Sequence, residues 1–256
     1  MKRILFAALT ATTMLVAVPA HAVPSAPSRQ PAAKPLQGLV ISLDPGHQLG
    51  NSNPKYASKI NHMRFNGYIM KQCNTTGTAT NQGYPEATFT WKVANKLKSK
   101  LEALGASVVM TRSTNSWSDW GPCTWIRGAY GGEHDADFAV SIHGNGESAR
   151  ARGFFIMSPG KIKGYTDDIY KQSYTLAKSM MNGMVAAGAE KANYIDPIVV
   201  WKDQTTLNFS DVPTVLIEVG NMRNRHDAAL MSSSAGQTKY ADWLLGGINE
   251  YAAHLK

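Results

Sequence analysis

Short apolar runs rich in β-branched residues alternate with longer segments of helical periodicity along most of the chain. The first run, at 38–43, ends in the turn sequence Asp44-Pro45-Gly46. Such short runs bounded by turn-forming or polar residues are typical of buried strands. Further runs of this kind occupy positions 108–110, 138–142, 154–157, 198–201 and 215–217. We predict a strand at each of them.

Helical periodicity is clearest after Glu86, where apolar residues recur at three- and four-residue intervals until Gly105 supplies a stop signal. Two more helices are predicted at about 168–187 and 236–255, and a shorter helical segment at about 125–130. Strands that alternate with helices predict an α/β fold. We expect a single domain with a twisted, mostly parallel β-sheet flanked by helices on both faces.

One connection in this pattern is unusually long. Residues 48–83 are polar and rich in Gly and Asn, and a structureless connection of that length is uncommon inside a compact domain. Long loops of this kind usually carry function, so we predict that the segment lies beside a site.

The N-terminus carries two basic residues, Lys2 and Arg3, followed by an apolar run and the sequence Ala20-His21-Ala22. This pattern predicts a secretion signal over residues 1–22. The apolar run is shorter than the roughly 20 residues of a membrane-spanning helix, although a retained anchor is the alternative. Residues 23–37 are rich in Pro and Ala and predict a flexible leader, with the folded part at 38–256.

The chain has two cysteines, Cys73 and Cys123. An even number in a protein predicted to reach an oxidising compartment favours a single disulfide bond. Two unpaired buried thiols are the alternative, and zinc thiolates are disfavoured because neither cysteine belongs to a C-x-x-C pair.

The formal net charge is +8, and loss of the predicted signal with its two basic residues leaves +6. A basic secreted protein favours anionic surroundings, namely wall polymers or membrane surfaces. No basic run interleaved with aromatic residues indicates nucleic acid, and no later segment indicates stable membrane insertion. Without a sustained heptad pattern, we expect a monomer.

Three predicted strands are followed by residues that bind metals or protons: His47, His143 and Glu218. In open α/β sheets, ligands gather at the carboxyl ends of the strands. Two histidines and one carboxylate form the three-ligand shell typical of catalytic zinc. By themselves these residues leave structural roles open, such as capping of the turn by His47 or a buried ion pair at Glu218.

Four segments, in order along the chain, resemble the zinc-dependent N-acetylmuramoyl-L-alanine amidases of the type 3, autolysin kind. They are Ile41-Ser-Leu-Asp-Pro-Gly-His47, Glu86 opening a helix, Asp137-Phe-Ala-Val-Ser-Ile-His143-Gly-Asn145, and Pro213-Thr-Val-Leu-Ile-Glu218-Val-Gly-Asn221. They span nearly the whole folded region, so residues 38–256 are interpreted as a catalytic amidase domain.

The resemblance implies that His47, Glu86 and His143 bind Zn²⁺ and that Glu218 is the catalytic acid and base. The implied reaction is hydrolysis of the amide bond between the lactyl group of N-acetylmuramic acid and L-alanine in peptidoglycan or muropeptide fragments. Cell-wall remodelling, cell separation and fragment recycling are the implied settings, in the periplasm or at the cell wall. Glu102 and Glu133 are possible substitutes for Glu86.

Supporting residues and departures from the family pattern complete the prediction. Ser141 and Asn145 are candidates for hydrogen bonds that support the site, with strand-end capping as the alternative.

Gln48-Leu49-Gly50 stands where the family usually has two glycines. We expect this difference to affect substrate preference and not the metal site. Residues 158–196 have room for one ordinary helix and not for a long, site-plugging insertion. We expect residues 48–83, tethered at Cys73, to border the groove.

Two other functions remain open from the sequence. A zinc peptidase that cuts inside the stem peptide uses the same ligands, and a wall-binding protein can keep the fold without the activity. We expect no separate wall-binding module.

Overall fold

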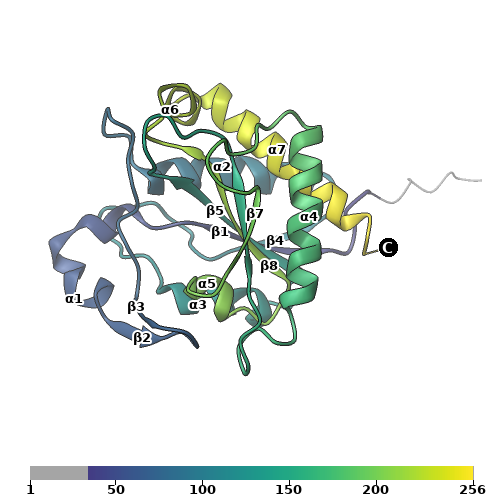
Figure 1. Ribbon diagram of the computed structural model, residues 1–256, viewed down its shortest axis with the longest axis horizontal. Helices are drawn as coiled ribbons and strands as arrows, with labels where there is room; N and C mark the ends of the chain where they lie inside the picture. Colours follow the sequence, from purple (N-terminus) through teal and green to yellow (C-terminus); the bar gives the residue numbers. More distant parts are fainter. Residues whose placement is uncertain (1–33, 256) are drawn as a thin grey trace, which may run out of the picture. The chain divides into compact units, whose positions relative to one another are not determined.

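A β-sheet of six strands runs through residues 34–255, the part of the chain that the computed structural model describes (Figure 1). Its strand order is β4-β1-β5-β8-β6-β7, and β6 runs antiparallel to β8 while the other pairs are parallel. The strands are β1 (Val40–Pro45), β4 (Ser107–Met110), β5 (Phe138–Asn145), β6 (Phe155–Pro159), β7 (Ile198–Trp201) and β8 (Thr214–Asn221). The predicted single α/β domain with a mostly parallel sheet is confirmed.

Helices cover both faces of the sheet. The apolar face packs against α2 (Glu86–Ala103), α4 (Tyr170–Ala186) and α7 (Ser234–Ala252), which form the main hydrophobic core with it. The other face packs against α3 (Thr124–Glu133) and the short α5 (Thr205–Asn208), while α6 (Arg225–Ser232) contacts α7 and β8. Figure 1 shows the larger helices on one side of the sheet and α3 with α5 on the other.

The alternation of side chains along the central strands explains which face of the sheet carries the candidate site residues. On β5, Val140 and Ile142 belong to the main core, so Ser141 and His143 point to the opposite face. On β8, Ile217 is likewise in the main core and Glu218 is on the opposite face. The face covered by α3 and α5 is therefore the polar, functional one.

Strands β5 and β8 are longer than predicted. His143 and Glu218 were predicted to follow their strands, but they lie within them and are paired in register. The apolar run ends before each of these residues, whereas the backbone hydrogen bonds of the ladder do not depend on side-chain polarity and continue. Helices α5 and α6 were not predicted, because each is too short to show a clear helical periodicity.

The segment 48–83 is more ordered than the single loop predicted for it. It contains two short 3₁₀ helices, Leu49–Ser52 and Pro54–Tyr56, the one-turn helix α1 (Ala57–Ile60), and a hairpin of β2 (Met63–Phe65) and β3 (Met70–Gln72). Local hydrogen bonds of Asn and Thr side chains shape these turns, which hydrophobic periodicity does not reveal.

The folded part begins earlier than Gly38. Leu36, placed in the predicted flexible leader, is only 2% exposed and donates its backbone N–H to the carbonyl of Leu104 over 2.9 Å. The predicted signal 1–22 and leader residues 23–33 lie outside the described residues. None of the helices in 34–255 has the length and apolar character needed to cross a membrane.

The predicted disulfide bond joins Cys73 to Cys123, with an S–S distance of 2.11 Å. It ties the end of the hairpin segment to the residue before α3, and both cysteines are buried beside Trp125. The backbone N–H of Thr124 also donates to the carbonyl of Cys73 over 2.7 Å. The bond therefore fixes the loop that continues from Cys73 toward the functional face.

Removal of this bond should destabilise the protein. The two cysteines are 50 residues apart, and a cross-link closing such a loop contributes roughly 4 kcal/mol in the chain-entropy model. We expect the double substitution Cys73→Ala and Cys123→Ala to lower the unfolding free energy by up to that amount in urea titrations. Reduced wild type is the control, and an unchanged midpoint would contradict the prediction.

Candidate active site

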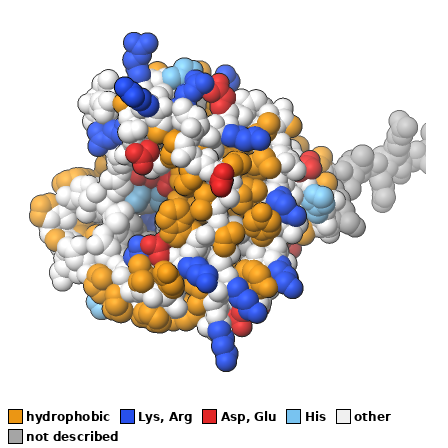
Figure 2. Space-filling model, in the orientation of Figure 1, with side chains coloured by type: hydrophobic (Ala, Val, Ile, Leu, Met, Phe, Trp, Pro, Cys, Tyr) orange, Lys and Arg blue, Asp and Glu red, His pale blue; other side chains and the backbone are white. Residues whose placement is uncertain are grey.

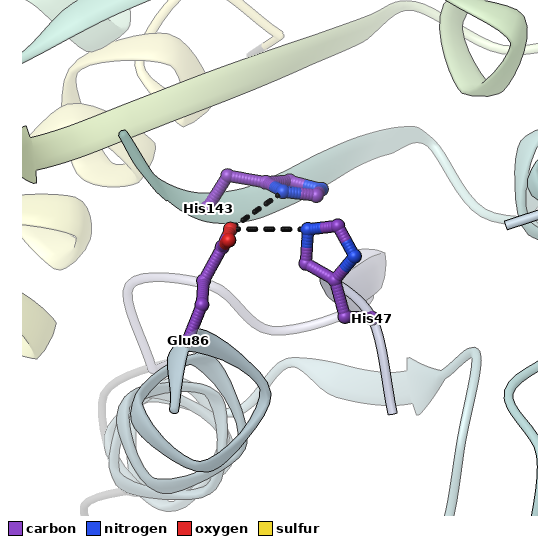
Figure 3. A group of neighbouring side chains, drawn as sticks. All are labelled: His47, Glu86 and His143. Atoms are coloured by element: carbon purple, nitrogen blue, oxygen red, sulfur yellow. Dashed lines mark hydrogen bonds and ion pairs between the residues drawn. The ribbon is translucent and has the colours of Figure 1, made fainter. Parts of the chain in front are cut away.

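Three side chains from distant parts of the chain converge on the functional face (Figure 3). His47 follows β1, Glu86 is the first residue of α2, and His143 lies on β5. Glu86 Oε1 is 3.2 Å from His47 Nε2 and 3.0 Å from His143 Nδ1, and one ligand atom from each residue lies within 4.8 Å of the others. The structure thus brings together the three residues predicted as a metal site.

The other carboxylates considered for this place do not reach it. Glu102 and Glu133 are exposed and belong to no cluster of metal-binding side chains within residues 34–255. Glu86 is 3% exposed, and its position follows from Pro85, which ends the preceding extended segment and cannot continue the helix backward. A carboxylate in the first helical turn is also favoured by the helix dipole.

The backbone holds the Glu86 carboxylate in one orientation. Oε1 accepts a hydrogen bond from the N–H of Gly144 over 3.0 Å, and Oε2 accepts one from the N–H of Thr78 over 2.9 Å. Gly77 makes the second contact possible: it has φ of +75°, and a Cβ there would lie 2.7 Å from Glu86 Oε2. The loop after the disulfide therefore closes against the cluster because residue 77 has no side chain.

His47 is oriented by contacts on both its backbone and its ring. Its φ is +59°, a left-handed conformation that is uncommon for residues other than Gly, and its carbonyl accepts a hydrogen bond from Arg127 over 2.7 Å. Ring atom Nδ1 lies 3.0 Å from the carbonyl oxygen of Thr75, so Nδ1–H donates there and Nε2 faces Glu86. A histidine held in this way presents one defined nitrogen to a ligand.

The charges of the cluster are strongly coupled. Burial opposes ionisation of both His47 and Glu86, but their mutual attraction outweighs it. The pKa of His47 is consequently raised, and the pKa of Glu86 is well below its usual range. The carboxylate is therefore ionised at neutral pH, as a metal ligand must be.

Beneath the cluster lies a buried ion pair between Asp44 and Arg127, with 2.6 Å between Oδ1 and Nη1. Thr111 donates its hydroxyl to Asp44 Oδ1 over 2.5 Å, and Ser141 donates to Oδ2 over 2.6 Å. Burial alone would raise the pKa of Asp44, but Arg127 and these hydroxyls lower it to about 2. Ser141 thus supports the site through Asp44.

A second buried cation, Arg112, holds the same turn from the other side. It donates to the carbonyls of Pro45 over 2.9 Å and Ala87 over 2.8 Å, and to the side chain of Gln48 over 3.2 Å. Burial, with repulsion from Arg127, lowers the pKa of Arg112 to about 9, which keeps it charged at neutral pH. Gln48, which departs from the family pattern, is 2% exposed and belongs to this scaffold.

Glu218 is next to His143 across the β5–β8 pair and has different surroundings from Glu86. Its Oε2 is buried and has no hydrogen-bond partner among residues 34–255. Burial and the neighbouring charge of Glu86 raise the pKa of Glu218 well above its usual range. Two nearby carboxylates with pKa values pushed in opposite directions are typical of a metal ligand beside an acid and base.

The four predicted site residues line one hollow of about 340 Å³; they are His47, Glu86, His143 and Glu218. Figure 2 shows this face hollowed, with histidine and acidic side chains at the floor. The segment predicted to border the groove does so, through Lys71, Gln72, Asn74, Thr75, Gly77 and Thr78. Asn145 also lines the hollow.

Comparison with known proteins identifies the family of this chain. The family model described as N-acetylmuramoyl-L-alanine amidase matches residues 41–250. The N-acetylmuramoyl-L-alanine amidase Rv3717 of Mycobacterium tuberculosis is 34% identical over 221 residues, which cover 85% of this chain and 88% of that protein.

Solved structures of two mycobacterial amidases share the fold. Ami1 from Mycobacterium smegmatis matches with a TM-score of 0.78 and 33% identity over 86% of this chain and 99% of that one. Ami1 from Mycobacterium abscessus matches with a TM-score of 0.77 and 35% identity over 84% and 99%. The fold and these similarities define an α/β amidase. The chain belongs to the N-acetylmuramoyl-L-alanine amidase family.

Asp44 should make stability depend on pH in the acid range. Its pKa is about 2 in the folded protein and 3.8 in the absence of these contacts, so folding favours the ionised form by about 2 kcal/mol. This contribution is complete above about pH 5 and is lost as the pH falls toward 2. In urea titrations at pH 2 to 6, Asp44→Asn should be less stable at pH 6 and should lose this part of the acid slope; an unchanged slope would contradict the assignment.

Gly77 has two properties that can be tested separately, its close approach to Glu86 and its left-handed backbone conformation. Gly77→Ala should lower turnover at least tenfold, because the added Cβ would displace Glu86 or the loop. Gly83→Ala is a matched control: Gly83 has φ of +84°, but nothing lies within 4 Å of an added Cβ. Metal content and turnover of both variants should be measured, and equal losses would refute the role of the contact.

Proposed function

We propose that this amidase is zinc-dependent, with His47, Glu86 and His143 as the metal ligands and Glu218 as the acid and base. The reaction is hydrolysis of the amide bond between the lactyl group of N-acetylmuramic acid and L-alanine in peptidoglycan or its muropeptide fragments. The observation that carries the proposal is the contrast between the ionised Glu86 inside the histidine cluster and the partnerless Glu218 beside it.

The donor set fits zinc. Two imidazoles and one carboxylate are ligands that catalytic zinc commonly takes, and one such atom from each residue lies within 4.8 Å of the others. Glu86 Oε1 lies 3.2 and 3.0 Å from the two ring nitrogens. When bound there, zinc supplies positive charge that polarises the scissile carbonyl and acidifies water.

The protein's own residues supply the proton transfers. Glu218 lines the hollow, and its Oε2 has no hydrogen-bond partner among residues 34–255, so this carboxylate is the group available to accept a proton from the attacking water. Its raised pKa lets it keep that proton until the tetrahedral intermediate collapses. The proton then goes to the alanine nitrogen, which is a poor leaving group unless protonated.

The setting follows from the substrate and the charge. We infer that the protein is secreted and acts in the periplasm or at the cell wall as a monomer, with the basic surface attracted to anionic wall polymers. Remodelling, cell separation and fragment recycling are compatible with this activity.

Hydrolysis of a purified muramoyl-peptide tests the assignment. Wild type and Glu218→Gln should each hold about one zinc, but the variant should turn over at least a hundredfold more slowly, because it cannot accept or return a proton. Glu133→Gln is the control, since it removes an exposed carboxylate and should leave turnover unchanged. Mass spectrometry of the products should show an intact peptide that starts with alanine.

Each contrary result has a distinct meaning. Loss of zinc in Glu218→Gln would make Glu218 a ligand. Cleavage within the peptide would favour a peptidase, and zinc without any hydrolysis in wild type would favour a wall-binding protein.

A further inference from the structure

A tyrosine of the loop before β7, Tyr194, flanks the catalytic carboxylate on the side away from the metal cluster. Glu218 is paired with His143 on β5 and with Phe155 on β6. The ring of Tyr194 packs edge-on against Phe155, with 6.1 Å between centroids. Phe155 and Leu216 share the same small apolar cluster, so this contact is on the functional face of the sheet.

The hydroxyl of Tyr194 has one hydrogen bond and a free proton. Asn145 Nδ2 donates to it over 2.7 Å, and the amide cannot be reversed because Asn145 Oδ1 accepts from the N–H of Gly146 over 2.7 Å. Within residues 34–255, nothing accepts the hydroxyl proton. Burial raises the pKa of Tyr194, and the carboxylate of Glu218 adds to this, so the phenol stays protonated at neutral pH.

The loop that carries Tyr194 is fixed on the preceding strand. Asn193 accepts from the N–H of Arg152 over 3.0 Å, and the N–H of Ala192 donates to the carbonyl of Phe154 over 2.7 Å. Gly153, with φ of +84°, permits this approach, because a Cβ there would lie 2.4 Å from the carbonyl oxygen of Lys191. Tyr194 is therefore positioned before any substrate arrives.

We propose that Tyr194 binds the stem peptide on the leaving side of the scissile bond, by donating its hydroxyl proton to a peptide carbonyl. This inference rests on the proposed role of Glu218. A carboxylate that protonates the alanine nitrogen must face the leaving peptide. On the side of Glu218 away from His143, Phe155 is its neighbour in the sheet, and Tyr194 of the loop before β7 packs against Phe155. Asn145 lines the hollow and donates to the hydroxyl of Tyr194, so this hydroxyl is one hydrogen bond away from the lining of the hollow.

The two reaction products serve as probes of the two sides of the site. Binding of the free stem peptide and of N-acetylmuramic acid should be measured by titration calorimetry on zinc-loaded wild type and Tyr194→Phe. Phenylalanine keeps the ring contact with Phe155 and removes only the donor. We expect the Kd of the peptide to rise about fivefold to tenfold, and that of the sugar to stay unchanged.

Tyr174→Phe is the control, because Tyr174 is exposed on α4 and should leave both affinities unchanged. Equal melting temperatures and zinc contents verify that each variant is folded. An unchanged peptide Kd in Tyr194→Phe, or an equal loss for peptide and sugar, would overturn the proposal. Wild type that binds the peptide without hydrolysing muramoyl-peptide would refute the proposed function alone, because the binding comparison does not depend on turnover.

Discussion

The ion pair between Asp44 and Arg127 determines how the chain turns after β1, and the position of His47 depends on that turn. Arg127 reaches from α3 to the Asp44 carboxylate and to the carbonyls of Pro45 and His47. Removing one member of such a buried pair leaves an uncompensated charge, which costs about 3–5 kcal/mol. The pair therefore links the covering helix, the first strand and the left-handed backbone of His47 in one arrangement.

Two carboxylates on one face act differently because their surroundings differ. Glu86 receives two backbone N–H groups and faces two imidazoles, all of which favour its charge. Glu218 is buried, receives no hydrogen bond at Oε2 from residues 34–255 and lies near the negative Glu86, so its pKa is raised. The two carboxylates therefore differ in proton affinity, which suits the proposed roles of Glu86 as a ligand and Glu218 as the acid and base.

Residues 48–83 form part of the wall of the hollow, although none of them is a predicted metal ligand. The disulfide at Cys73 fixes this segment, and Thr75 and Thr78 then reach His47 and Glu86 through backbone atoms. Asn145, at the end of β5, also lines the hollow, and it donates a hydrogen bond to Tyr194 in the loop before β7. The proposed peptide position lies beside Tyr194, beyond Glu218.

Much of this protein was determined by local sequence. The apolar runs specify the strands and the face that forms the core, and motifs around His47, His143 and Glu218 indicate the site, because periodicity and side-chain chemistry act over short distances. The family motifs also pointed to Glu86, but only the tertiary structure excluded Glu102 and Glu133 from the cluster. It alone showed that Arg112 and Arg127 support the turn and that Tyr194 lies near Glu218. Those relations join residues tens of positions apart, and they depend on packing and burial that no local pattern records.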